Sequence, residues 1–327
     1  MSQFFRSILA ILFAILSAAL VAGVEGAEQA FLTAEEGGRD YSLQGEFVGI
    51  VETWGGAYGA QVISLGSDTF DVVLYAGGLP GDGYRNEVAK KSVAVKAEGD
   101  IAQGSGDGFA VQLQKNALSI TDLNGKSIAQ LAKVQRQSPT MGAKPPKDAL
   151  ILFDGTSVDA FKGGQLNEDK CLGVGCETVE KFGDHRLHLE FRTPFMPLAR
   201  GQKRGNSGVY LQSRYEVQVL DSFGLAGKDN ECGGIYKVAE PNFNMCFPPL
   251  TWQTYDIDFT AAKYDDQGTK SKNAQATIRL NGVVIHQDLE LPSHTPGKNK
   301  EANEPGALFL QNHNDPVVYR NIWIVKK

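Results

Sequence analysis

The chain has 327 residues, enough for about two domains that each bury a core. Apolar residues make up 42% and charged residues 21%, values that exclude a mainly disordered or collagen-like protein. Lys and Arg total 32 against 38 Asp and Glu, for a net charge of -6, so no cationic surplus is present for binding nucleic acid.

The N-terminal segment has the pattern of a secretory signal peptide. Arg6 precedes an unbroken run of small and apolar residues from Ser7 to Val24, and small residues follow. We therefore predict a signal peptide over residues 1–26 and a secreted or periplasmic protein. The run is long enough to span a bilayer, so contact with a membrane is expected only if this segment is not cleaved.

Residues 27–137 are predicted to form a small all-β domain. Short β-rich runs are bounded there by Gly, Asp and Asn, a spacing typical of a small barrel or sandwich. These runs are Gly59–Gly66, Thr69–Gly78, Ser92–Gly99, Phe109–Gln114 and Ala117–Gly125. Residues 138–149 follow with three prolines and a glycine and little to bury, so we expect a linker at this point.

Residues 150–327 are again β-patterned, without a helical period of comparable length. Seven or more antiparallel strands with long connections predict a two-sheet sandwich of jelly-roll type. The predicted strands are His185–Thr193, Ser207–Ser213, Tyr215–Asp221, Thr254–Thr260, Ala276–His286, Ala307–His313 and Arg320–Lys326. A long polar loop from Leu291 to Gly306 either covers a site or is mobile.

The four cysteines form two local pairs. Cys171 lies close to Cys176 in the sequence, and Cys232 lies close to Cys246. In an exported protein an even number of cysteines favours disulfides, and local pairing closes the shortest loops. We expect these two local bridges, although the sequence permits three connectivities. A zinc site is the alternative, but neither spacing is the tight one of structural zinc modules.

Side-chain alternation assigns the faces of the strand Tyr215–Asp221. If Val217 and Val219 point into the core, Glu216 and Gln218 share the opposite face. Two hydrogen-bonding side chains then lie together on a surface that is able to bind a ligand.

The same argument applies to the strand Ala307–His313. Burial of its two leucines places Phe309, Gln311 and His313 together on the other side. An aromatic ring beside polar groups is typical of a sugar site. Simple alternation in a half-exposed antiparallel sheet would produce the same pattern without a function.

A series of motifs in order resembles the 3-keto-disaccharide hydrolase domain family. The resemblance extends from about Asp148 to the end of the chain and implies a concanavalin-like β-sandwich. It also implies activity on glycosides that carry a ketone at sugar carbon 3. The motifs are LFDG (Leu152–Gly155), GNSGVYLQ (Gly205–Gln212), YEVQVLD (Tyr215–Asp221), CGGIYK (Cys232–Lys237), WQTYDIDF (Trp252–Phe259), LNG (Leu280–Gly282) and GALFLQNH with YRNIWI (Gly306–Ile324).

The first hypothesis is an enzyme that cleaves 3-keto-glycosides. The ketone acidifies the hydrogen on carbon 2, so a base removes it, the enolate expels the oxygen on carbon 1, and water adds to the enone. His313 is predicted as base or acid, with Glu216 as the alternative base. Asp221 would orient His313 or bind a hydroxyl, and Arg320 would stabilise the enolate. The residues expected to contact the sugar ring are Asn206, Gln218, Gln311 and Phe309.

The sequence firmly implies no cofactor for this chemistry. A divalent metal is an alternative to Arg320 as the electrophile. No dinucleotide-binding fingerprint is present, so the ketone would come from a separate sugar 3-dehydrogenase.

Two alternatives use the same residues. One is a carbohydrate-binding, lectin-like module without catalysis, because sandwich folds serve both roles. The other is ordinary hydrolysis by Glu216 and Asp221, although alternation sends these two carboxylates to opposite faces. Convergence of His313 and Glu216 in one cleft, with a perturbed pKa, would favour the enzyme.

Overall fold

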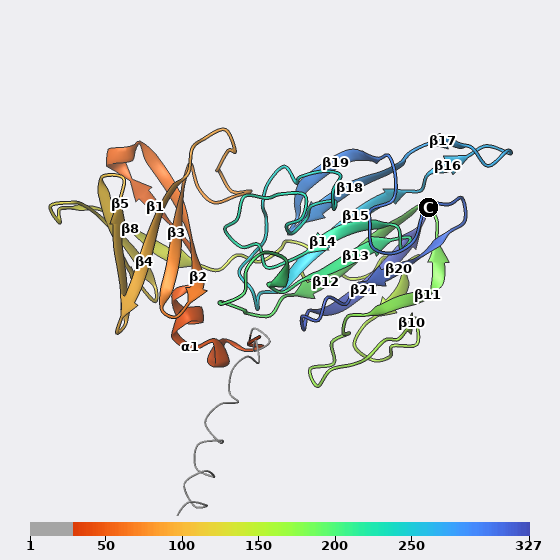
Figure 1. Ribbon diagram of the computed structural model, residues 1–327, viewed down its shortest axis with the longest axis horizontal. Coiled ribbons are helices and arrows are strands. Elements are labelled where there is room, and N and C mark those ends of the chain that lie inside the picture. The colour runs from red at the N-terminus through yellow and green to blue at the C-terminus, as the bar shows by residue number, and fades with distance from the viewer. Residues whose placement is uncertain (1–28) are drawn as a thin grey trace, which may run out of the picture.

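The computed structural model describes residues 29–327, which form a β-barrel followed by a two-sheet β-sandwich. Figure 1 shows the barrel on the left and the sandwich on the right. The predicted signal peptide lies outside the described residues. The described part of the chain is nearly all β, as its alternating and Gly-punctuated sequence predicts.

The barrel is closed by pairing of its first strand with its last, so it leaves no free sheet edge. Its strands alternate buried and exposed residues, and the buried set includes Phe47, Phe70 and Phe109 in a core separate from that of the sandwich. A short 3₁₀ turn, Glu52–Trp54, links the first two strands. The strands in order are β1 (Gly45–Val51), β2 (Gly56–Gly66), β3 (Thr69–Ala76), β4 (Lys91–Glu98), β5 (Ile101–Gly106), β6 (Phe109–Gln114), β7 (Ala117–Asp122) and β8 (Ser127–Val134).

One helix, α1 (Ala34–Leu43), precedes the barrel and was not expected in an all-β domain. Its N-cap residue Thr33 accepts a hydrogen bond from the backbone of Glu36, and the Glu36 side chain accepts from the backbone of Thr33. This reciprocal capping box is visible in the sequence as Thr-x-x-Glu. The helix changes direction at Gly38, which has a positive φ of 54°.

The sandwich consists of a five-stranded sheet packed on a six-stranded sheet within residues 150–327. Most neighbouring strands are distant in sequence, as in a jelly roll. The five-stranded sheet runs β10 (Phe161–Lys162), β11 (Cys176–Phe182), β20 (Gly306–Leu310), β13 (Ser207–Leu211), β14 (Tyr215–Val219). The six-stranded sheet runs β19 (Val283–Leu291), β18 (Ala274–Leu280), β15 (Gln253–Thr260), β12 (His185–Arg192), β21 (Val318–Lys326), β9 (Leu150–Phe153). A small ribbon of β16 (Lys263–Tyr264) and β17 (Lys270–Lys272), and a 3₁₀ turn at Gly201–Lys203, complete the elements.

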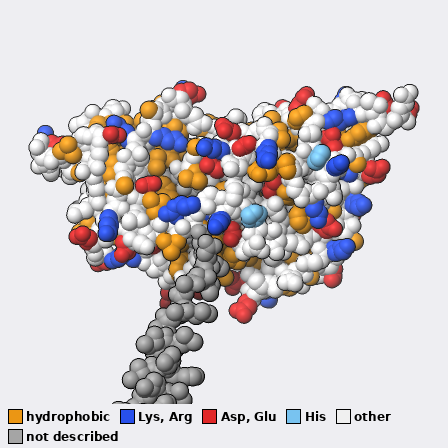
Figure 2. All heavy atoms as spheres, in the orientation of Figure 1, with side chains coloured by type: hydrophobic (Ala, Val, Ile, Leu, Met, Phe, Trp, Pro, Cys, Tyr) orange, Lys and Arg blue, Asp and Glu red, His pale blue; other side chains and the backbone are white. Residues whose placement is uncertain are grey.

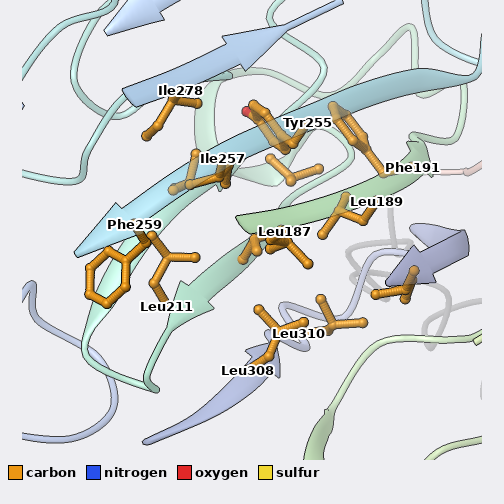
Figure 3. Close-up of a cluster of buried hydrophobic side chains, with 14 of the residues drawn as sticks. Leu187, Leu189, Phe191, Leu211, Tyr255, Ile257, Phe259, Ile278, Leu308 and Leu310 are labelled. Carbon is orange, nitrogen blue, oxygen red and sulfur yellow. The ribbon is translucent and has the colours of Figure 1, made fainter. Parts of the chain in front are cut away.

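The core of the sandwich lies between the two sheets (Figure 3). Leu308 and Leu310 of β20 point toward Leu187 and Leu189 of β12 in this layer. Each fully buried Leu contributes about 1.5–3 kcal/mol through removal of apolar surface from water. The burial of these leucines fixes the face of β20, and it sends the intervening side chains to the outer surface of the five-stranded sheet.

Residues 138–149 lie against the six-stranded sheet through specific hydrogen bonds. The Ser138 hydroxyl contacts the Thr254 hydroxyl at 2.6 Å, and Thr140 donates to Asp256 at 2.6 Å. The backbone N–H of Gly142 donates to Glu190 at 2.6 Å. The connection that we predicted as a linker is therefore anchored on the sandwich.

A buried histidine lies at the centre of this anchor. His188 is fully buried, and its Nδ1 lies 2.7 Å from Asp256, while its Nε2 lies 3.8 Å from Glu190. Burial lowers the pKa of His188, but the hydrogen bond to Asp256 and the nearby Glu190 carboxylate outweigh burial, so the net pKa is raised above 6.5. Burial raises the pKa of Glu190, but its interactions with His188, Asn321 and Arg320 dominate and bring it down to about 2.

These shifts predict a pH dependence of stability. The stabilisation from His188 is complete below the unfolded pKa of about 6.5 and is lost as pH rises through the raised folded value. The stabilisation from Glu190 is present above about pH 4.5 and is lost as pH falls toward 2. We expect His188→Gln to lower the free energy of unfolding by about 1–3 kcal/mol at pH 6 and by less at pH 9, as measured by urea denaturation. A deficit that is equal at both pH values would contradict this assignment.

Neither predicted disulfide is present. Cys171 and Cys176 are free and buried, and their sulfurs contact different backbone carbonyls, those of Asp169 and Gly173. Cys176 begins β11 and belongs to the hydrophobic core of the sandwich, whereas Cys171 lies outside that core.

The second pair is close but unbonded. Cys232 and Cys246 are both buried free thiols, and they lie close enough for each to shift the pKa of the other. The Cys232 sulfur lies 3.5 Å from the Tyr255 hydroxyl, and Cys246 donates to the carbonyl of Leu220. The prediction of local pairing therefore identified spatial neighbours here, whereas the bond itself is absent.

The surface has interspersed acidic and basic side chains on the face shown in Figure 2. In the part of the chain that the structure describes, no helix has the length and hydropathy needed to span a bilayer.

Candidate functional site

A pocket of about 190 Å³ lies on the outer face of the five-stranded sheet. It is formed by β13, β14 and the residues after β20, which are neighbouring strands in the sandwich (Figure 1). Its volume is below the range of about 300–1,000 Å³ for sites that enclose a drug-sized ligand, so it suits one sugar ring. The lining residues are Gln202, Asn206, Tyr210, Glu216, Gln218, Tyr236, Pro296, Gly297, Gln311 and His313.

The structure brings together most of the residues that alternation and the resemblance selected. Asn206, Glu216, Gln218, Gln311 and His313 all line this pocket. Val217 and Val219 are fully buried in the core, which is why their neighbours on β14 point outward.

Glu216 is the carboxyl group of the pocket. Its side chain is almost completely buried, and this burial raises its pKa to about 7, while a hydrogen bond with Tyr210 acts in the opposite direction. A carboxyl group with a pKa near neutrality is suited to accept and return a proton at physiological pH.

Gly208 leaves the space that the Glu216 side chain occupies. Gly208 and Glu216 are diagonal neighbours on β13 and β14, because Gly208 pairs with Gln218 and Tyr210 pairs with Glu216. A Cβ atom on Gly208 would lie 2.4 Å from Glu216 Oε1. Any larger residue at position 208 would therefore displace the carboxylate.

Tyr210 connects three parts of the site. Its hydroxyl accepts from the Gln311 amide at 3.2 Å, and its single proton is available either to the carbonyl of Pro296 at 3.3 Å or to the Glu216 carboxylate, whose pKa it lowers. Tyr210 was not among the predicted site residues. Alternation could have found it, because Val209 on the same strand is buried in the core.

The amides form a second polar group in the pocket. The Gln218 side chain donates to Asn206 Oδ1 at 2.7 Å, and Asn206 donates to the carbonyl of Gln202 at 2.8 Å. The Oε1 of Gln311 is buried and has no hydrogen-bond partner among residues 29–327. This unpartnered acceptor is available to a ligand hydroxyl group.

The long loop between β19 and β20 covers one side of the pocket. Thr295 accepts from the backbone N–H of Glu216 at 2.9 Å, and its own N–H donates to the carbonyl of Arg214 at 2.8 Å. Pro296 and Gly297 then form part of the pocket wall. The loop, which was expected either to cover a site or to be mobile, therefore covers this pocket.

The CGGIYK motif lies along the free edge of β14. Gly233 donates to the carbonyl of Gln218, the N–H of Gln218 donates to the carbonyl of Gly234, and Tyr236 follows into the pocket wall. These backbone bonds fix the strand that carries Glu216. The sequence contained no periodic signal that would have placed Tyr236 there.

His313 and Phe309 lie at the border of the site. His313 is exposed and lines the pocket. Phe309 is half-buried, packs on Tyr210 at a ring distance of 5.6 Å and lies under the Lys298 amine at 3.9 Å. Phe309 thus packs beneath the loop and supports the pocket. It was predicted to contact the sugar ring, but it does not line the pocket.

The predicted role of Asp221 is wrong. Its carboxylate is buried and accepts from Arg204 Nε at 2.7 Å, and it does not line the pocket. Because β14 ends at Val219, the chain turns before Asp221 and directs it toward Arg204 rather than toward His313.

The predicted role of Arg320 is also wrong. It belongs to β21 in the six-stranded sheet, whereas the pocket is built on the five-stranded sheet. Its Nε donates to Glu190 at 2.7 Å, and its guanidinium lies 4.0 Å from the ring of Trp252. Among the described residues that line the pocket, no Lys or Arg replaces it as an electrophile.

Among residues 29–327, no group of three or more His, Cys, Asp or Glu is arranged to hold a metal ion. Of the side chains around the Glu216 carboxyl, the Tyr210 hydroxyl is the one whose hydrogen bond affects its pKa.

The hydrogen bond from Tyr210 predicts how Glu216 should titrate. Because this bond lowers the pKa of Glu216, Tyr210→Phe should raise the pKa further above about 7. The acidic limb of the pH-rate profile should then move to higher pH, with a several-fold loss of activity at pH 7. Steady-state rates between pH 5 and 9 would measure this shift. Tyr84→Phe, in the barrel, is the control and should leave the acidic limb unchanged. An unchanged limb in Tyr210→Phe would show that Tyr210 does not affect the pKa of Glu216.

A family model matches residues 120–325 of the chain, more than half of its length, and it describes a 3-keto-alpha-glucoside-1,2-lyase-like domain. The chain belongs to this family. The match to this family begins before the linker, within β7, and ends within β21, so it includes the last part of the barrel and nearly all of the sandwich. The resemblance seen in the sequence began only at about Asp148.

A solved structure shares this fold. A candidate glycosyl hydrolase from Parabacteroides distasonis ATCC 8503 is 31% identical to this chain, with a TM-score of 0.51 over 55% of this chain and 84% of that one. Two other candidate glycosyl hydrolases of the same organism are 18% and 17% identical, with TM-scores of 0.40 and 0.38. Each covers 55% of this chain, and these matches cover 94% and 99% of the respective relatives.

No curated protein matches the chain. The family model and the first structural relative together identify a carbohydrate-active protein with a β-sandwich fold.

Proposed function

We propose that this protein cleaves the glycosidic bond of 3-keto-glycosides by elimination between sugar carbons 1 and 2. The observation that carries the proposal is the buried Glu216 carboxyl, with a pKa of about 7, in a pocket of about 190 Å³ lined by amides. The description of the family as 3-keto-alpha-glucoside-1,2-lyase-like supports the same reaction.

In the proposed reaction, the Glu216 carboxylate removes the proton from carbon 2, and the electron pair of that C–H bond forms an enolate with the carbon 3 ketone. The enolate then re-forms the ketone and a double bond between carbons 1 and 2, and the bond from carbon 1 to the glycosidic oxygen breaks. His313 donates the proton that the departing oxygen needs. No electrons are gained or lost overall, so the step needs no oxidant.

The Gln311 amide stabilises the enolate. Its Nε2 donates one N–H to the Tyr210 hydroxyl at 3.2 Å, which holds the amide in place, and its second N–H is available to the negative charge that develops on the carbon 3 oxygen. This donor takes the role that the sequence had assigned to Arg320. The unpartnered Oε1 of Gln311 accepts from a ring hydroxyl.

Ordinary hydrolysis by two carboxylates fits this pocket less well. That chemistry requires two carboxyl groups about 5–9.5 Å apart on either side of the bond. Glu216 is the one carboxyl group among the described residues that line the pocket, since Asp221 is engaged with Arg204. Addition of water to carbon 1 of the enone would complete a net hydrolysis without a second carboxylate.

The test is incubation of the purified protein with 3-keto-trehalose, 3-keto-sucrose and the two unoxidised parent sugars. We expect cleavage of the ketones and not of the parents, with an enone detectable by ultraviolet absorption before hydration. Cleavage of the parents but not of the ketones would refute elimination. Binding of the ketones without turnover would instead identify a lectin-like module.

His313 provides a second test of the mechanism. His313→Ala should lower turnover of a 3-keto-disaccharide by about 10²-fold, because general acid catalysis contributes about 10²–10⁴-fold. Its thermal midpoint should stay near that of the wild type, because the side chain is exposed. His294→Ala, in the covering loop but outside the pocket lining, is the matched control and should retain activity. Normal turnover in His313→Ala would leave Glu216 as both base and acid.

Two further expectations accompany this proposal. A separate sugar 3-dehydrogenase would supply the ketone, and the signal peptide would carry the protein to the periplasm or the exterior. If cell fractionation found the protein only in the cytoplasm, the predicted location would be contradicted.

A further inference from the structure

A second cavity of about 560 Å³ lies where α1, the barrel and the sandwich meet. Its walls come from both ends of α1, from β1, β8 and the β6–β7 turn of the barrel, and from the loop before β15. Figure 1 shows α1 at the edge of the barrel. This cavity shares no lining residue with the pocket around Glu216.

The cavity has more unpaired positive than negative charge. Arg136 and Glu46, which both line it, neutralise each other through a bidentate pair at 2.7 and 2.6 Å. Lys133 and Lys115 also line the cavity, and among the described residues neither has a carboxylate within ion-pair distance. Glu35 is the remaining acidic residue of the lining, and it is exposed. Two lysines therefore face one solvated carboxylate in a protein whose net charge is -6.

The amine of Lys133 is held in place by its neighbours but still has N–H donors without a partner. Its amine donates to the carbonyl of Ser42 at 2.6 Å and lies 5.6 Å from the ring of Phe47. Its stem lies against Gly45, where an added Cβ would be 2.7 Å from the Lys133 Cε atom. An ammonium group has three donors, so two remain after the bond to Ser42. Burial lowers the pKa of this amine to about 8, with a contribution from Lys115, so a bound anion would stabilise its charged form.

Neutral hydrogen-bonding groups complete the cavity. Gln44 is 3% exposed, its Oε1 accepts from the backbone of Ser64, and its Nε2 has no hydrogen-bond partner among residues 29–327. Tyr41, Asn116 and Thr251 add hydroxyl and amide groups to the wall. Amides and hydroxyls of this kind bind sugar hydroxyls, whereas the lysines bind an acidic group.

We propose that this cavity binds an acidic sugar, with its carboxylate at Lys133 and Lys115 and its hydroxyls at the neutral groups of the wall. The site is separate from the Glu216 pocket, and its binding does not depend on the reaction proposed there.

The test is isothermal titration calorimetry of the full protein at constant ionic strength, with D-glucuronate, D-glucose and acetate as probes. D-Glucuronate should bind at least about 10-fold more tightly than either D-glucose or acetate, because only this probe has both the carboxylate and the hydroxyls. Equal affinity for D-glucuronate and D-glucose would overturn the role of the lysines, and equal affinity for D-glucuronate and acetate would overturn the role of the sugar.

Variants then locate the binding. Lys133→Met should weaken D-glucuronate binding by about 10-fold or more and Lys115→Gln by about 3-fold or more, because charge-assisted hydrogen bonds are lost. Lys115 is exposed, so Lys115→Gln should fold. This variant tests the proposal if Lys133→Met does not fold. Lys96→Gln, an exposed lysine on β4 outside the cavity, should bind normally. Wild-type affinity in Lys115→Gln and in folded Lys133→Met would overturn the proposal.

Discussion

Glu216→Gln should lower the turnover of a 3-keto-disaccharide by about 10²–10⁴-fold, the usual contribution of a general base. Glutamine has the same shape and fits the space above Gly208, but it cannot accept the proton from carbon 2. The loss should appear in kcat, while KM changes by less, because the amide retains most contacts with the ring. Steady-state kinetics on the full protein would measure both constants.

The free energy of unfolding of Glu216→Gln should be higher than that of the wild type, although its turnover is lower. Because burial raises the pKa of Glu216 from 4.5 to about 7, ionisation of the folded protein carries a penalty that grows between these pH values. Removal of this penalty would stabilise Glu216→Gln by up to about 3 kcal/mol at pH 8, at 1.36 kcal/mol per pKa unit. Glu98→Gln, on an exposed position of β4, should change neither property. Normal turnover in Glu216→Gln would exclude Glu216 as the base.

Arg204→Met should destabilise the protein by about 3–5 kcal/mol, because it leaves the carboxylate of Asp221 buried without its partner. The Arg204 and Asp221 side chains are 6% and 0% exposed and are joined at 2.7 Å. Arg204 also donates to the carbonyl of Ser64 in the barrel, so its removal weakens the contact between the two units. Urea denaturation would measure the loss.

Two comparisons make this prediction specific. Replacing both charges, Arg204→Met with Asp221→Leu, should recover much of the stability, because the unpaired charge is then gone. Arg186→Met breaks an ion pair with Asp258 in which Arg186 is 56% exposed, and it should cost less than about 1 kcal/mol. Similar losses in Arg204→Met and Arg186→Met would contradict the structural role of Arg204 and Asp221.

The alternation of side chains along a strand was sufficient to predict which residues point outward, where the strand has one buried face. In β14 and β20 the positions of two valines and two leucines fixed which neighbours point outward, and Glu216 and Gln311 are where this pattern placed them. Alternation did not recognise a turn within the predicted strand Ala276–His286. Asn281 and Gly282 have positive φ angles there, and they divide the segment into the β18–β19 hairpin.

The sequence alone determined the all-β class, the two-sheet sandwich and the face of each strand that carries the candidate site, because these features depend on local periodicity and on the order of motifs. Only the tertiary structure decided which faces meet. It placed Arg320 on the opposite sheet and paired Asp221 with Arg204, because sheet order and the direction of the chain after a strand depend on contacts between distant residues. It also decided the pKa of Glu216, since desolvation results from the loop and strands that bury this carboxyl group and not from the residues beside it in the sequence.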